Sequence, residues 1–104
     1  MKYLLTIIFA LVSSDAFAAK FEETRHVKRV FTESNNIAGF YTVEGLPQCV
    51  YGIMYIDLST DTGRALFSIV LTAKSLNWEI RRMDYYLTNE TYGTRCNITT
   101  IHAE

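Results

Sequence analysis

The 104-residue sequence has few of the residues that build linkers, metal sites or redox centres. It contains one proline, two cysteines and two histidines, and it has no Cys-x-x-Cys pair. The charges nearly cancel, at a formal net charge of −1, so no basic field for capturing nucleic acid is expected. No nucleophile-elbow, Walker, zinc-protease or calcium-loop motif is present in the sequence. These absences favour a non-enzymatic protein without metal or cofactor.

The only long apolar run of the sequence lies at the amino terminus. A positively charged start precedes about ten apolar residues, and the run ends in the small-residue pattern Ala16-x-Ala18. This order is typical of a secretory signal peptide, and the run is too short to anchor the chain across a hydrocarbon core of about 30 Å. We expect cleavage of residues 1–18 and export of one small domain, residues 19–104, to the bacterial periplasm or beyond. The mature chain should not insert into a membrane.

The two cysteines, Cys49 and Cys96, both lie in the predicted mature domain. Exported proteins of this size commonly join an even number of cysteines in disulfides, because the compartment is oxidising. Two cysteines allow one intramolecular pairing, and closing so long a loop is worth about 3–4 kcal/mol. We therefore predict a structural Cys49–Cys96 disulfide.

Alternating and apolar segments predict three strands, one helix and two further strands. The predicted strands are Arg25–Thr32, Ile37–Glu44, Val50–Leu58, Trp78–Leu87 and Cys96–His102. Asn35 and Asn36 tolerate positive φ and suit a tight hairpin turn after the first strand. In that first strand, the alternation places Val27 and Phe31 on one face.

Two irregularities are expected near the end of the chain, and one face of the third strand needs a cover. The alternation slips at Arg81–Arg82, which indicates a bulge, and residues 88–95 are polar and predict a loop. Both faces of the strand at residues 50–58 are apolar or aromatic, whereas a sheet with one solvated side would alternate polar residues there.

The predicted helix covers about Asp61–Ser75. Capping residues precede it, and Asn77 suits the left-handed position that ends a helix. Its apolar face is wider than the stripe expected of a surface helix on a monomer. A buried strand over residues 65–72 is the alternative, although the length of the segment and its capping residues favour the helix.

Aromatic residues supply the candidate ligand contacts. Trp78 follows the helix and Tyr92 lies in the predicted loop, where either ring could stack on a sugar or pack against a partner. Arg82, in the Arg81–Arg82 pair, could bind an anion such as a phosphate or a sialic acid carboxylate. The alternatives are a solvated arginine pair at a bulge and aromatic rings that only fill the core.

Residues Thr62–Ile80 resemble the helix and following strand of the small B subunits of bacterial AB5 toxins, particularly proteins similar to the subtilase cytotoxin B subunit. The positions of Cys49 and Cys96 are also similar. The resemblance implies a five-stranded OB-type barrel, with the helix between the third and fourth strands. It also implies a homo-oligomeric ring, a pentamer in the toxins, which binds glycans and pairs with a toxin A subunit. The sequence departs from the pattern at the helix end, where Asn77 replaces the usual glycine.

These observations lead to two hypotheses of function, beside the alternative of a monomeric domain without a ligand. The first is an exported, oligomeric glycan-binding protein with contacts from Trp78, Tyr92 and Arg82. The second is a periplasmic protein-interaction module, such as an inhibitor or an envelope-associated partner, which would use the same aromatic residues against a protein.

Overall fold

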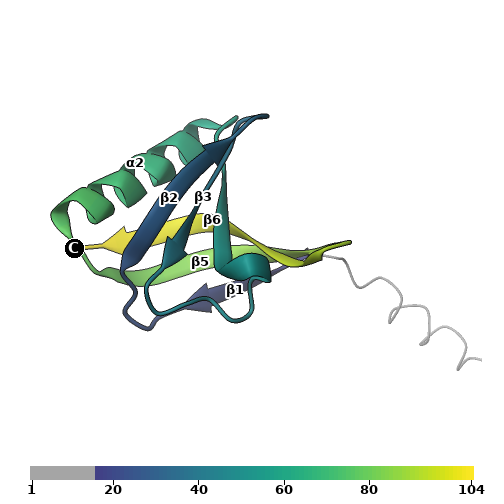
Figure 1. Cartoon of the computed structure of the whole chain (residues 1–104), viewed down its shortest axis with the longest axis horizontal. Helices are drawn as coiled ribbons and strands as arrows, with labels where there is room; N and C mark the ends of the chain where they lie inside the picture. The colour runs from purple at the N-terminus through teal and green to yellow at the C-terminus, as the bar shows by residue number, and fades with distance from the viewer. Residues whose placement is uncertain (1–15) are drawn as a thin grey trace, which may run out of the picture.

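The computed structural model describes residues 16–104, so the predicted leader lies outside the described residues except for its last three. A mixed sheet of six strands is combined with one long helix in this part of the chain (Figure 1). The elements are β1 (Ala16–Phe21), β2 (Val27–Glu33), β3 (Ile37–Thr42), the short 3-10 turn η1 (Val50–Gly52), β4 (Ile53–Asp57), α2 (Asp61–Leu76), β5 (Ile80–Glu90) and β6 (Gly93–Ala103). The predicted class, mainly β with one helix and one disulfide, is confirmed.

The predicted closed barrel of five strands is wrong. The sheet has six strands in the order β1-β5-β6-β4-β3-β2 and does not close. Residues 16–21 form a strand that the sequence pattern did not reveal, and this strand pairs along the outer side of β5. Within the described residues, the far edge of the sheet meets β5 only at an isolated bridge between Arg25, two residues before β2, and Ile80, whose backbone bonds measure 2.9 and 2.8 Å. A single bridge does not make a closed ladder.

The β2–β3 hairpin turns at the predicted asparagines. Asn35 and Asn36 have φ values of 67° and 59°, a region that asparagine enters at lower cost than most residues. The face predicted for β2 is wrong, because a bulge lies between Val27 and Arg29. It turns Val27 and Val30 towards the core, whereas Phe31 packs against tyrosines outside it.

The β5–β6 hairpin is longer than predicted. The expected slip is confirmed as a register shift between Ile80 and Arg82. However, β5 continues to Glu90 and β6 begins at Gly93, so the loop predicted over residues 88–95 is wrong. The polar residues there sit on a two-stranded backbone ladder, whose hydrogen bonds do not depend on apolar side chains.

The helix α2 has both predicted ends. The Thr60 side chain accepts a hydrogen bond of 2.9 Å from the Gly63 backbone N–H, which satisfies one free donor of the first turn. Asn77 adopts the left-handed conformation at φ 56° and ψ 41°. Gly63 is required because a Cβ there would lie 1.6 Å from the Asp57 carbonyl oxygen. These contacts fix α2 against the end of β4.

The core lies between α2 and the inner side of the sheet. The helix contacts β2, β3, β4 and β6, and it contributes Leu66, Val70 and Ala73 to the core. The predicted Cys49–Cys96 disulfide is confirmed and joins the loop before η1 to β6. The third strand begins later than predicted, at Ile53, because the chain makes the η1 turn first.

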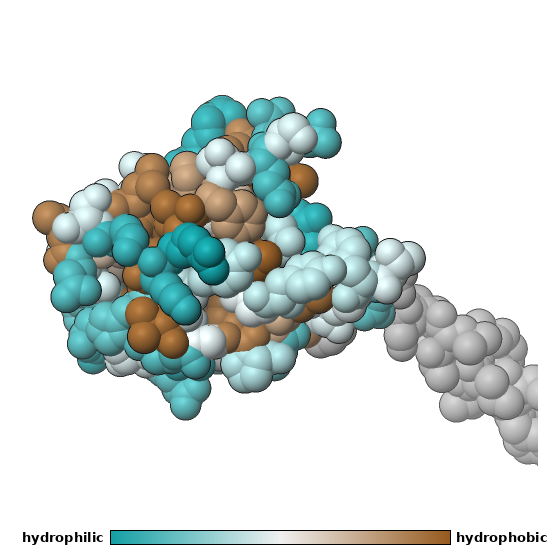
Figure 2. Space-filling model, viewed as in Figure 1, coloured by the Kyte–Doolittle hydropathy of each residue, from teal (hydrophilic) through white to brown (hydrophobic). Residues whose placement is uncertain are grey.

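Part of α2 remains apolar on its solvent side. Ile69, Leu71 and Leu76 are exposed to 37%, 40% and 60% respectively. In the view of Figure 2, brown apolar surface lies over the region that α2 occupies in Figure 1. The wide apolar face predicted from the sequence is therefore only partly used in the core of one chain.

Candidate functional site

The side of the sheet turned away from the core carries a cluster of aromatic and arginine side chains. Along β3 and β4 the residues Phe40 and Met54 are in the core, so alternation places Tyr41 and Tyr55 on the opposite face. We call this cluster the aromatic face. It consists of Arg29, Phe31, Tyr41, Tyr55 and Arg95.

Ring contacts hold the aromatic face together. The Phe31 ring meets Tyr55 edge to face at 6.2 Å and tilts against Tyr41 at 5.8 Å, both within the range of favourable aromatic pairs. Arg29 lies 4.5 Å above the Tyr41 ring and Arg95 lies 4.2 Å above the Tyr55 ring. Such cation–π contacts are worth about 0.5–2 kcal/mol, depending on how dry they are. This network covers the second face of β4, as its apolar sequence required.

A hollow of about 270 Å³ adjoins the aromatic face. It is lined by Ile37, Tyr55, Asp57, Tyr86, Arg95, Asn97 and Ile98, which come from β3, β4, β5 and β6. The lining combines aromatic rings with a guanidinium, a carboxylate and an amide. This mixture of apolar surface and a few convergent polar groups is typical of small-molecule sites.

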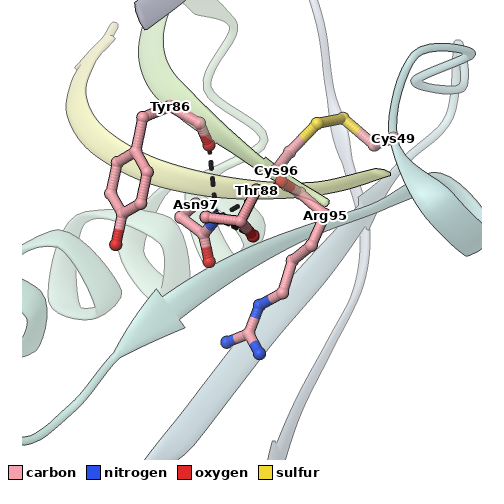
Figure 3. Close-up of a disulfide and its surroundings, with 6 residues drawn as sticks. All are labelled: Cys49, Tyr86, Thr88, Arg95, Cys96 and Asn97. Carbon is pink, nitrogen blue, oxygen red and sulfur yellow. Dashed lines mark hydrogen bonds between the residues drawn. A yellow bond between two sulfur atoms is a disulfide. The ribbon is translucent and has the colours of Figure 1, made fainter. Parts of the chain in front are cut away.

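Asn97 is fixed in place on the β6 side of the hollow (Figure 3). Its side-chain Nδ2 donates to the Tyr86 carbonyl, the Thr88 hydroxyl and the Arg95 carbonyl, each at 3.2 Å. Because the amide nitrogen is occupied, the Oδ1 of Asn97 is the atom that remains to accept a hydrogen bond. The amide is thus oriented before any ligand arrives.

The charged groups of the hollow are Arg95 and Asp57. The Nε of Arg95 is buried and makes no hydrogen bond within the described residues, although buried donors are normally paired. The Asp57 carboxylate accepts bonds of 2.6 and 2.9 Å from the Ser59 hydroxyl and backbone. These bonds, aided by the nearby Arg95 charge, lower the pKa of Asp57. The hollow therefore offers one cation with a free donor and one anion.

Tyr55 contributes a hydroxyl that keeps its proton. Burial raises the pKa of Tyr55 above its usual value, and the negative charges of Glu33 and of an ionised Tyr92 would raise it further. The Arg95 charge opposes this shift without cancelling it. Tyr55 thus serves as a neutral donor or acceptor at neutral pH.

No family model, curated protein or solved structure matches the chain. The resemblance to AB5 B subunits stays a prediction, and the candidate site rests on geometry. Within residues 16–104, no cluster of three or more histidine, cysteine or acidic side chains could hold a metal ion. In the same part of the chain, no helix has the length and apolar character needed to cross a membrane.

Two of the three ligand contacts predicted from the sequence, Trp78 and Tyr92, lie at opposite ends of the β5–β6 hairpin. Trp78 follows α2 and packs partly against the core, near the end of the β5–β6 hairpin where Ile80 pairs with Ala103. Tyr92 lies at the other end, between the paired residues Glu90 and Gly93. A strand advances about 3.3 Å per residue, so the length of β5 separates the two aromatic residues.

Arg82 and Tyr92 each have a partner that the sequence did not reveal. Arg82 donates two hydrogen bonds to Asp84, at 3.0 and 3.1 Å. These bonds raise the pKa of Arg82 and lower that of Asp84. Tyr92 stacks on Tyr51 at 5.9 Å with 15° between the ring planes. Arg82 is therefore engaged within its own strand, whereas Tyr92 and Tyr51 form an exposed aromatic pair.

Sequence reasoning missed most residues of the hollow. Arg95 fell in the predicted loop, although it belongs to β6. Tyr86 and Asn97 face each other across β5 and β6, and this pairing depends on the hairpin register. One signal was present in the sequence, namely the doubly apolar strand containing Tyr55, which indicated that its second face must be covered.

Proposed function

We propose that this chain is an exported, non-enzymatic glycan-binding protein and that the hollow beside the aromatic face holds the sugar. The observation that carries the proposal is the Arg95 guanidinium, held over Tyr55 beside Tyr86 and Asn97. A sugar ring has apolar C–H faces and a rim of hydroxyls. Aromatic rings and fixed polar groups complement both.

Each polar group of the hollow has a distinct task in this proposal. The Arg95 guanidinium, which lines the hollow, supplies a charge-assisted hydrogen bond to a carboxylate or hydroxyl of the sugar. Asp57 and the Oδ1 of Asn97 accept bonds from hydroxyls of the sugar. The half-exposed Tyr86, with 41% of its surface accessible, provides the ring for stacking. An acidic sugar fits this arrangement better than a neutral one, because the free donor belongs to a cation.

Assembly into a homo-oligomer accompanies this function. The exposed apolar residues Ile69 and Leu76, which are seven positions apart and therefore share one side of α2, support it, since exposed apolar patches commonly mark interaction surfaces. A ring of five copies around their helices is the form we propose. A toxin A subunit is the corresponding partner, and an exported ADP-ribosyltransferase or protease encoded beside this chain would support it.

A glycan array probed with the mature chain tests the proposal. We expect binding to sialylated or other acidic sugars, and Tyr86→Ala should abolish it. Trp78→Ala and Tyr92→Ala test the contacts predicted from the sequence. Binding that is lost in Tyr92→Ala and kept in Tyr86→Ala would move the site to the Tyr51–Tyr92 pair. A mass of about 10 kDa at micromolar concentration would exclude the ring.

The Tyr51–Tyr92 pair favours a second candidate function, a periplasmic protein-interaction module. Tyr51 is exposed to 64% and Tyr92 to 43%, and exposed tyrosines are typical of protein interfaces. This alternative would be established if the chain bound no acidic or neutral sugar on the array and bound a protein partner that the Tyr51→Ala variant no longer binds.

A further inference from the structure

The strand β1 runs across the position where the leader is expected to be cut. Ala16 and Ala18 pair with Thr88 and Tyr86 of β5, and Ala19 pairs with Tyr85. The predicted cleavage after Ala18 therefore falls in the middle of a six-residue strand. One half of β1 belongs to the leader, and the other half remains with the mature chain.

Cleavage changes the edge of the sheet. In the described chain β5 lies between β1 and β6. Without residues 16–18, its backbone from Tyr86 to Thr88 loses the partner on the β1 side. Backbone N–H and C=O groups that are left unpaired on such an edge can form hydrogen bonds with an additional strand.

We propose that the last three residues of the leader cap the β5 edge, and that their removal opens this edge for β2 of a second copy. The inference rests on the predicted cleavage and not on glycan binding. Hydrolysis adds water across the Ala18–Ala19 peptide bond, leaving a carboxylate on Ala18 and an amine on Ala19. Residues 16–18 depart with the leader, and residues 19–21 stay beside Met83–Tyr85.

The second edge of the open sheet identifies the partner strand. The sheet ends at β2 on the side opposite β1. Within the described residues, the only backbone pairing on the outer side of this edge is the Arg25–Ile80 bridge, just before β2. β2 carries two exposed cations, Lys28 and Arg29, and one exposed carboxylate, Glu33, whereas the exposed Glu90 ends β5 two residues beyond Thr88. Opposite charges favour pairing β5 with β2, whereas pairing two β5 edges would bring like charges together.

This pairing joins two different edges, so it is heterologous. Each copy offers a β5 edge to one neighbour and a β2 edge to the other. Such head-to-tail contacts close into a ring when the rotation permits, and otherwise extend into a filament. The leader thus keeps an uncleaved chain from assembling.

Two exported chains that differ by three residues test the proposal. A borrowed leader is placed so that one chain begins at Ala16 and the other at Ala19, and both are sized by light scattering across concentration. We expect the Ala19 chain to assemble at a concentration at least tenfold lower than the Ala16 chain. Equal masses and equal midpoints, including two monomers, would overturn the proposal.

Amide hydrogen exchange on the same two chains locates the contact. In the Ala19 chain, protection at Tyr86–Glu90 and at β2 should rise with concentration, and in the Ala16 chain it should not. Protection that rises at β5 alone would overturn the assignment to β2 and indicate two β5 edges. A glycan array on the same samples is a separate measurement. An absence of sugar binding on it would contradict the proposed function but not the proposed pairing of the β5 edge with β2.

Discussion

The guanidinium of Arg95 lies 4.2 Å above the ring of Tyr55, although the two residues are far apart in the sequence. Their strands, β4 and β6, are parallel neighbours, with Tyr55 directly beside Asn97. Arg95 is two residues earlier in β6, which is the diagonal distance that a long side chain can bridge. The candidate site therefore exists only once this long-range pairing has formed.

Removing the disulfide should weaken that pairing. Cys96 pairs with Met54 at the same β4–β6 contact, and the bridge to Cys49 closes a long loop. The double substitution Cys49→Ser, Cys96→Ser should lower the free energy of unfolding by about 3–4 kcal/mol, as measured in urea.

Reductant added to the wild-type chain is the matched control, since it should give the same loss. Unchanged urea midpoints in both experiments would show that the bridge has no stabilising role.

The helix end allows a test at one residue. Asn77 occupies the left-handed region, where a residue with a Cβ loses about 1–2 kcal/mol and asparagine somewhat less. Asn77→Gly should leave the free energy of unfolding equal or slightly higher, and Asn77→Ala should lower it by about 1 kcal/mol. Ser75→Ala, in the exposed last turn, is the control. An equal effect of alanine and glycine at position 77 would show that the left-handed conformation there does not disfavour a residue with a Cβ.

The pair His26–Glu44 should make stability depend on pH. The ring Nδ1 of His26 lies 2.6 Å from Glu44, and its Nε2 lies 3.7 Å from Glu79. The hydrogen bond to Glu44 raises the pKa of His26 above 6.5, outweighing the small effect of burial. Burial raises the pKa of Glu44, but the hydrogen bonds from His26 outweigh it and leave this pKa below 4.5.

The sign of the effect follows from these two shifts. The contribution of His26 is fully present below pH 6.5 and is lost as pH rises through its higher folded pKa. The contribution of Glu44 is present above pH 4.5 and is lost as pH falls through its lower folded pKa. The pair should therefore stabilise the fold most between these limits. Urea unfolding from pH 4 to 9 should show a decline above pH 6.5 that His26→Gln removes and His102→Gln keeps.

Local signals in the sequence predicted the elements whose causes are local. The Asn35–Asn36 turn, the slip at Arg81–Arg82 and the helix end at Asn77 each depend on a few adjacent residues. The closed barrel failed because residues 16–21 looked like the end of a leader and carry no strand pattern, yet they pair with β5. Backbone pairing with an exposed edge requires little of the side chains.

The candidate site was less predictable than the fold. Trp78 stood out because it follows the helix end and Tyr92 because it lies in the predicted loop, whereas Tyr55 and Tyr86 lie inside predicted strands and were not chosen as ligand contacts. The bulge in β2 carried Phe31 to the aromatic face, and the long hairpin brought Arg95 into β6. Both depend on register, which the sequence pattern alone does not determine when both faces of a strand are apolar.

Titration of the mature chain with the acidic sugar that binds best on the array tests whether the hollow beside Tyr55 and Arg95 binds the sugar. Arg95→Gln removes the cation of the hollow, and Arg81→Gln removes an exposed arginine paired with Glu79 at the far end of β5. We predict that Arg95→Gln weakens binding about tenfold or more and that Arg81→Gln matches the wild type. Equal affinities for the wild type and Arg95→Gln would contradict the assignment of this hollow as the sugar site.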